Sequence, residues 1–229
     1  MGVPIPAEEL EKILRQFDRL SNLLVDTSSL IQIEKAGFLS LLSGKVQLFT
    51  LPQVREEYLR GDPSLPFPLD VRILSSPTPT RMAPRETADC APPTNSAASA
   101  DEALLAVART RRFALLSEDR KLLLKADGLG LEYYNALMML EFLEYRRTAE
   151  SRKKPLTADQ ALESAMQKHS SDPGPSPSGL FSLAENPPFD YPSLKRRLLA
   201  QSRYSLEVRR FAEQLHTFIE KVGGSRILH

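Results

Sequence analysis

Short apolar runs that stop at an acidic residue and continue with helical periodicity recur along this chain of 229 residues. Residues 23–25 are followed by Asp26 and small hydroxyl residues, and residues 113–116 lead in the same way to Asp119. This pattern is typical of a buried strand that turns directly into a helix, as in parallel α/β folds. We therefore expect Asp26 and Asp119 at the carboxyl ends of two parallel strands.

Two further acids are predicted at the same edge of the sheet. A strand over residues 46–51 leads into a helix that carries Glu57 near its first turns, and Asp101 lies in a capping box that opens a helix over residues 103–110. Crossover helices run antiparallel to the strands, so this second helix begins at the carboxyl edge. Because ligand sites of open parallel sheets form at that edge, all four acids are expected there.

The four acids together indicate a metal site. Each acid alone is also explained by helix capping, because Asp and Glu are favoured in the first turn of any helix. Several crowded carboxylates repel one another, however, and a divalent cation relieves that repulsion. The chain shows no His or Cys cluster with metal spacing. Oxygen ligands of this kind suit Mg²⁺ or Mn²⁺ better than zinc.

Four motifs stand in order around these acids. They read Val25-Asp-Thr-Ser-Ser-Leu30, Pro52-Gln-Val-Arg-Glu-Glu57, Ala100-Asp-Glu-Ala-Leu-Leu-Ala-Val-Ala108 and Leu116-Ser-Glu-Asp-Arg-Lys-Leu122. Their order and spacing resemble those of the PIN-domain (PIN-like) ribonuclease family. The resemblance covers about residues 20–147 and ends in a segment, 130–135, that is similar to the last strand of the family. It implies an α/β fold, a three-layer α/β/α domain with a central parallel sheet.

The resemblance also implies an activity, the metal-dependent hydrolysis of RNA phosphodiester bonds by an endoribonuclease that uses Mg²⁺ or Mn²⁺. Asp26 and Asp119 would ligate the metal directly, and Asp101 would bind the same ion or a second one. Glu57 would orient or deprotonate the attacking water. The family pattern favours Glu57 over the adjacent Glu56, and only one of two neighbouring helical residues can face a site.

Three other residues are candidates for supporting roles. Ser28 and Ser117 could hold a metal-bound water or a phosphate oxygen, and helix capping is the alternative explanation for both. Many relatives have Asn where Ser28 stands. Arg120, beside the predicted metal site, is our preferred contact for a substrate phosphate.

We expect four segments along the chain. These are an N-terminal helix (1–22), the PIN-like nuclease domain (23–147), a helix with a Pro-rich linker (148–192) and a C-terminal helical extension (193–229). Within the domain, the Pro-rich stretch 75–98 is interpreted as a flexible loop, either disordered or an RNA-contacting lid.

The C-terminal extension contains one amphipathic helix. Its apolar residues follow spacings of three and four, namely Val208, Phe211, Leu215, Phe218 and Val222, and Gly223-Gly224 is predicted to end it. The stripe predicts docking onto the domain, with a homodimer or a protein-partner interface as the alternative.

Composition excludes several classes of protein. The 30 Lys and Arg against 29 Asp and Glu give no overall nucleic-acid signal, so any basic surface must be local. The single Cys90 excludes an internal disulfide and fits a reducing compartment. No apolar run approaches the length of a membrane span, and the N-terminal residues lack the pattern of a signal peptide. We therefore expect a soluble, cytoplasmic protein without a membrane partner.

Two alternative functions remain open. The chain could be the toxin component of a toxin–antitoxin pair, although it is longer than the compact toxins of that class. It could also be a catalytically inert PIN scaffold, an interaction module that recruits a partner through the C-terminal stripe. A phosphatase that uses two aspartates would need an acid where Ser28 stands, and no Gly-rich turn supports dinucleotide binding.

Overall fold

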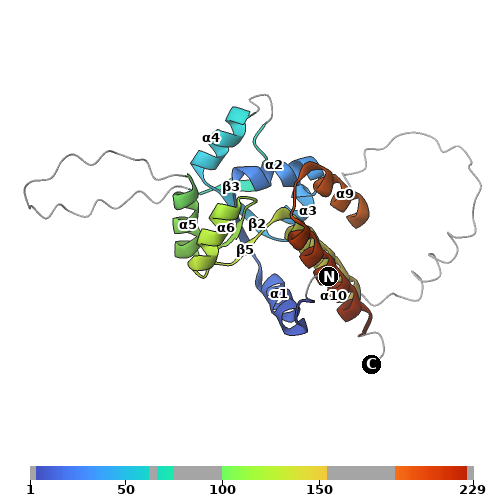
Figure 1. Cartoon of the computed structure of the whole chain (residues 1–229). Helices are drawn as coiled ribbons and strands as arrows, with labels where there is room; N and C mark the ends of the chain where they lie inside the picture. The colour runs from blue at the N-terminus through green and yellow to red at the C-terminus, as the bar shows by residue number, and fades with distance from the viewer. Residues whose placement is uncertain (1–3, 62–65, 75–99, 154–188, 226–229) are drawn as a thin grey trace, which may run out of the picture.

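A computed structural model of the chain describes residues 4–61, 66–74, 100–153 and 189–225. At its centre lies a five-stranded sheet whose pairings are all parallel, in the order β3-β2-β1-β4-β5 (Figure 1). The strands are β1 (Asn22–Val25), β2 (Gln47–Thr50), β3 (Val71–Ile73), β4 (Ala114–Leu116) and β5 (Tyr133–Tyr134). The predicted α/β class with a central parallel sheet is confirmed.

Helices connect and cover these strands. They are α1 (Ala7–Arg19), α2 (Thr27–Ala36), α3 (Leu39–Ser43), α4 (Pro52–Gly61), α5 (Ala100–Arg111), α6 (Arg120–Gly128), α7 (Ala136–Lys153), α9 (Tyr191–Gln201) and α10 (Leu206–Ser225). No helix in the described ranges has both the length and the apolar content needed to cross a bilayer.

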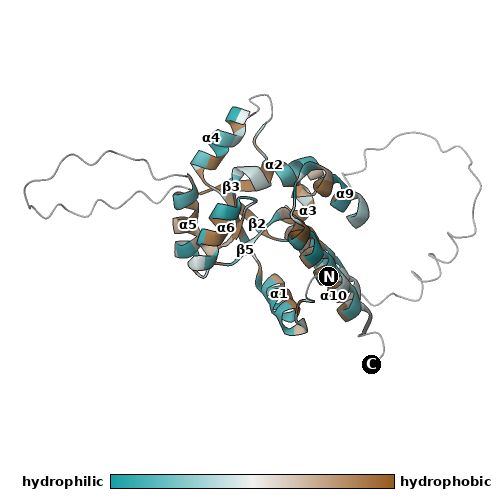
Figure 2. Ribbon diagram, viewed as in Figure 1, coloured by the Kyte–Doolittle hydropathy of each residue, from teal (hydrophilic) through white to brown (hydrophobic). Residues whose placement is uncertain are grey.

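The sheet buries an apolar core on each of its faces, because successive residues of a strand point to opposite sides. In β1, Leu23 and Val25 join the core shared with α1, α2 and α7, whereas Leu24 joins the core beneath α5 and α6. In β4, Leu116 and Leu115 divide in the same way. Brown apolar and teal polar residues accordingly share individual helices (Figure 2). The sheet is therefore the middle one of three layers, with helices on both of its faces.

The C-terminal helices α9 and α10 belong to the core that contains α1, α2 and α7. Leu198 of α9 and Leu215 of α10 are fully buried there, and α10 packs along α7 while α9 packs along α2. The predicted apolar stripe therefore docks onto the domain. Of the stripe, Leu215 is fully buried and the phenylalanines are only partly buried, whereas Ala212 and Ile219, which the predicted stripe did not include, are also buried.

Two predicted helix ends are wrong. The helix α5 begins at Ala100 rather than at residue 103, and α10 continues through its two glycines to Ser225. The helix α7 crosses the predicted domain boundary at residue 147 and continues to Lys153. Near its end α7 is supported by an ion pair between Arg147 and Glu144, with N and O 2.6 Å apart. A glycine ends a helix when it adopts a left-handed conformation, and otherwise its cost within a helix is only about 1 kcal/mol.

Several predictions fall outside the described residues. The predicted loop over 75–98 lies within the undescribed range 75–99. Most of the predicted linker segment, 148–192, lies within the undescribed range 154–188.

Candidate functional site

One pocket at the carboxyl edge of the sheet brings together the four acids singled out from the sequence. Its volume is about 180 Å³. It is lined by Asp26, Glu57, Asp101 and Asp119 together with Thr27, Ser28, Val54, Ala100 and Leu104. These acids come from the end of β1, the middle of α4, the first turn of α5 and the start of α6. Of the two adjacent glutamates in α4, Glu57 lines the pocket and Glu56 does not.

The register of the sheet explains why Asp26 and the β4 turn meet. Val25 pairs with Leu116, so Asp26 and Ser117 leave neighbouring parallel strands side by side. The backbone amide of Asp26 donates to the carbonyl of Leu116 at 3.1 Å, which extends the ladder by one bond. Asp26 then caps α2, and its Oδ1 accepts a hydrogen bond from the amide of Ser29 at 2.7 Å.

The second oxygen of Asp26 accepts two hydroxyl hydrogen bonds. Ser117 Oγ donates to Oδ2 at 2.5 Å, and Ser28 Oγ donates to the same oxygen at 3.0 Å. The Asp26 side chain is nevertheless buried, and this burial raises the pKa of its carboxyl although the hydrogen bonds act to lower it. Burial disfavours the charged form, so a cation beside Asp26 would stabilise its carboxylate.

Glu57 and Asp119 are more accessible and are also held by donors of the chain. Glu57 is exposed, and its Oε2 accepts from Thr27 Oγ1 at 2.7 Å. Asp119 is exposed and caps α6, since its Oδ1 accepts from the amide of Lys121 at 2.7 Å. The amide of Asp119 donates to Ser117 Oγ at 3.0 Å. The Ser117 hydroxyl therefore bridges Asp26 and Asp119.

The oxygen atoms that line the pocket suit an oxygen-preferring cation, but the carboxylates do not lie close enough together to form a metal-binding group. Within the described ranges, no group of three or more Asp, Glu, His or Cys side chains is close enough to hold a metal ion. The lining nonetheless offers four carboxylates and the hydroxyls of Thr27 and Ser28, and it contains no Lys or Arg. These oxygens are the donors that Mg²⁺ and Mn²⁺ prefer. Glu57 and Asp119 are exposed, so they can rotate without unburying apolar surface.

The three predicted supporting residues differ in how they lie relative to the pocket. Ser28 lines the pocket, whereas Ser117 is fully buried behind it. The capping explanation for Ser117 is wrong, because Asp119 caps α6. Arg120 is exposed in the first turn of α6 and is not among the residues that line the pocket. The geometry thus gives no support to Arg120 as a phosphate contact.

Sequence reasoning missed Glu118, which stands between Ser117 and Asp119. Its Oε1 accepts hydrogen bonds from the amide of Ala136 at 2.6 Å and from the hydroxyl of Tyr204 at 3.2 Å. Burial raises the pKa of Glu118 to about 7, and the neighbouring charge of Asp26 acts in the same direction. No local signal could have identified this contact, because Tyr204 lies 86 residues further along the chain.

A second buried acid, Glu141, was also missed. This residue of α7 is completely buried and contacts three side chains of the C-terminal helices. Tyr191 donates its hydroxyl proton to Glu141 Oε1, Lys195 Nζ lies 3.4 Å from the same oxygen, and His216 Nδ1 lies 2.9 Å from Oε2. A lone glutamate within the apolar run that begins α7 was a usable sequence signal. Glu141 anchors α9 and α10 rather than contributing to the pocket.

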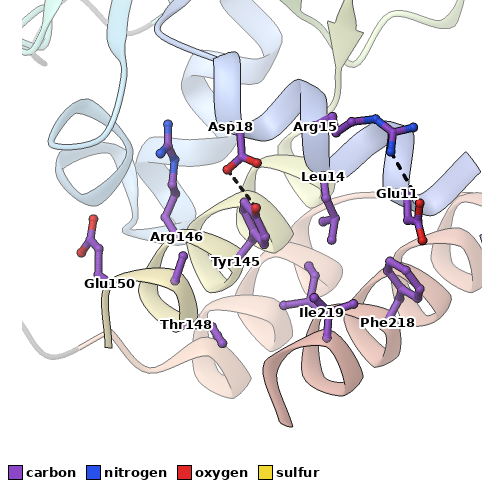
Figure 3. A pocket seen from close by; sticks show the side chains of 12 residues that line it. Glu11, Leu14, Arg15, Asp18, Tyr145, Arg146, Thr148, Glu150, Phe218 and Ile219 are labelled. Carbon is purple, nitrogen blue, oxygen red and sulfur yellow. Dashed lines mark hydrogen bonds and ion pairs between the residues drawn. The ribbon is translucent and has the colours of Figure 1, made fainter. Parts of the chain in front are cut away.

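A larger cavity lies away from the acidic pocket. It encloses about 770 Å³ between α1, α7 and α10. Figure 3 shows Leu14 of α1 facing Phe218 and Ile219 of α10, and the hydrogen bond from Tyr145 to Asp18 between α7 and α1. None of the four predicted acids lines this cavity. Its size alone therefore does not connect it with the chemistry of the acidic pocket.

A scan of protein-family models, a search of curated proteins and a search of solved structures each find no match to this chain. The PIN resemblance therefore rests on the motifs and on the pocket itself.

Proposed function

We propose that this protein is a PIN-type endoribonuclease that hydrolyses RNA phosphodiester bonds with Mg²⁺ or Mn²⁺. The observation that carries the proposal is the single pocket lined by Asp26, Glu57, Asp101 and Asp119. These acids come from four separate elements at the edge of a parallel sheet where ligands commonly bind. Helix capping explains Asp26 and Asp119 singly, but it does not require them to share a pocket with Glu57.

The charge of the pocket makes a cation necessary for this activity. The lining holds four acids and no base, and an RNA phosphodiester is itself an anion. Substrate and pocket repel each other unless a cation lies between them. Asp26, Asp119 and Asp101 would hold this cation. When bound, it supplies an acidified water and neutralises charge on the phosphoryl oxygens.

The remaining residues act on the water and on the carboxylates. Glu57 extends from α4 on the same helical face as Val54, which also lines the pocket. It orients the attacking water and accepts its proton. Thr27 holds the Glu57 carboxylate through its hydroxyl, and Ser117 holds Asp26. No covalent enzyme intermediate is required, because water is the nucleophile.

A second candidate is an inert PIN scaffold. The observation that favours it is that Asp26, Glu57 and Asp119 each accept hydrogen bonds from the chain's own donors, with no ready metal-binding group among the described residues. A scaffold would retain this arrangement, whereas a nuclease would exchange some of these bonds for a cation.

The two candidates are separated by cleavage assays on the full chain. A panel of end-labelled single-stranded and hairpin RNAs is incubated with Mn²⁺, Mg²⁺ or a chelator. The variants Asp26→Asn and Glu57→Gln are compared with Glu56→Gln, the matched control on the same helix. We expect metal-dependent cleavage that falls about 100-fold or more in the first two variants and is unchanged in the control. Cleavage that ignores both the chelator and Asp26→Asn refutes the mechanism, and complete inactivity favours the scaffold.

A further inference from the structure

The C-terminal extension contacts the loop behind the acidic pocket through Tyr204, in the turn between α9 and α10. The hydroxyl of Tyr204 lies 3.2 Å from Glu118 Oε1 and 3.3 Å from Gln32 Oε1. Glu118 is the residue between Ser117 and Asp119, and Gln32 belongs to α2, which Asp26 caps. The Tyr204 hydroxyl therefore contacts both α2, which Asp26 caps, and the loop that leads to Asp119.

The start of α7 holds the same two side chains in place. The first amides of a helix lack partners within the helix. The Ala136 amide donates to Glu118 at 2.6 Å, and the Leu137 amide, close to the Tyr204 hydroxyl, acts to lower the pKa of that phenol. The helix itself is fixed in the core through residues such as Leu137 and Phe142, which are fully buried. Glu118 and Tyr204 are thus anchored to a rigid element.

A second contact from the extension secures α2. Ser202 Oγ donates to Gln32 Oε1 at 2.7 Å, the same oxygen that Tyr204 approaches. Nearby, Leu198 of α9 is fully buried in the core that α2 shares. The turn after α9 therefore contacts α2 and the Ser117–Asp119 loop together, and it lies outside the pocket lining.

We propose that Tyr204 and Glu118 are positioning residues of the acidic site, which fix the loop from Ser117 to Asp119 and thereby the placement of Asp119 relative to Asp26. This inference rests on the proposed nuclease function. The connection is short, because Ser117 bonds to Asp26 at 2.5 Å and to the Asp119 amide at 3.0 Å. A shift of the loop would be transmitted directly to both acids. Ser117 is the direct partner of Asp26, and the loss of such an outer partner commonly costs about 10- to 100-fold in metal affinity or activity. Glu118 and Tyr204 act on the acids through the loop that carries Ser117.

A purely structural role for Glu118 makes a different prediction. The N-terminus of α7 already has a cap, because Asn135 Oδ1 accepts from the Met138 amide at 2.9 Å. If Glu118 served only as a further cap, its loss would lower the melting temperature and leave the turnover of the folded enzyme unchanged. A positioning role requires a change in turnover and in the Mn²⁺ concentration that supports it.

The test compares four variants of the full chain at saturating RNA. Tyr204→Phe removes only the hydroxyl, Glu118→Ala removes the acceptor, and Glu118→Gln retains an acceptor oxygen. Tyr191→Phe is the matched control, because this tyrosine belongs to the same extension but bonds to Glu141, away from the pocket. For each protein, kcat, KM and the half-saturating Mn²⁺ concentration are measured, with a thermal melt as a check on folding.

We expect Tyr204→Phe to lower kcat by about tenfold and Glu118→Ala by about 10- to 100-fold, both with little change in KM and a higher Mn²⁺ requirement. Glu118→Gln should recover most of the activity, and Tyr191→Phe should stay within about twofold of the wild type. An active wild type with an unchanged kcat and Mn²⁺ requirement in Tyr204→Phe overturns the positioning role alone. A wild type without metal-dependent cleavage overturns this role and the proposed function together.

Discussion

The hydroxyl bridge through Ser117 yields the sharpest stability prediction. Ser117 is completely buried, donates to Asp26 Oδ2 at 2.5 Å and accepts from the Asp119 amide at 3.0 Å. Ser117→Ala removes both bonds and leaves a space the size of one oxygen atom. Water cannot easily replace the hydroxyl at a position with no exposed surface, so the loss should appear in the free energy of unfolding.

The expected magnitude follows from the two bonds. A hydrogen bond to a charged group is worth about 1.5–3 kcal/mol, and one between neutral groups is worth about 1 kcal/mol. Because the Asp119 end is exposed and water can replace part of that bond, we expect Ser117→Ala to cost about 2–3 kcal/mol. For a protein of this size that corresponds to a fall of about 4–12 °C in melting temperature.

The assay is urea unfolding followed by circular dichroism, without added metal. Ser28→Ala is the matched control, because Ser28 donates to the same carboxylate oxygen at 3.0 Å but is exposed. Its cost should be below about 0.5 kcal/mol. An Asn at position 26 can still hydrogen-bond Ser117 but carries no charge, so in an Asp26→Asn background Ser117→Ala loses only bonds between neutral groups, and we expect its cost to fall to about 1–2 kcal/mol.

Two results would refute this reasoning. One is a cost for Ser117→Ala that equals the cost for Ser28→Ala, which would mean that the buried bridge does not stabilise the fold. The other is an identical cost in the wild-type and Asp26→Asn backgrounds, which would mean that Ser117 and Asp26 are not energetically coupled.

Two further predictions concern the C-terminal helices. The hydrogen bond to Glu141 is the main cause that raises the pKa of His216 above its ordinary value of 6.5; Glu220 adds to the increase, while burial and Lys195 oppose it. The stabilisation from charged His216 is therefore complete below about pH 6.5 and is lost as pH rises through the raised pKa. In urea titrations, the free energy by which the wild type exceeds His216→Gln should shrink across that pH range. A difference that stays constant with pH would count against an ion pair between His216 and Glu141. Leu215→Ala, at a fully buried position of α10, should cost about 2–5 kcal/mol in unfolding free energy. Leu206→Ala, at an exposed position of the same helix, should cost under about 0.5 kcal/mol. Equal costs would show that α10 is not docked in solution.

Local patterns in the sequence were sufficient to locate the pocket acids. A buried strand, an acid and a helix in direct succession place Asp26 and Asp119 at one edge, because parallel strands all end there. The resemblance to the family pattern favoured Glu57 over Glu56, and helical geometry required only that one of these adjacent residues faces the site. The predicted phosphate contact of Arg120 stays a prediction, because its side chain does not line the pocket.

What the sequence by itself determined is the alternation of strands and helices and the edge at which the acids gather, because both follow from periodicities of two and 3.6 residues. Only the tertiary structure decided which side chains hold those acids. Ser117 and Asp26 are separated by 91 positions, and Tyr204 and Glu118 by 86. Hydrogen bonds between such distant residues depend on strand register and on the docking of α9 and α10, and neither is encoded in any short stretch of chain.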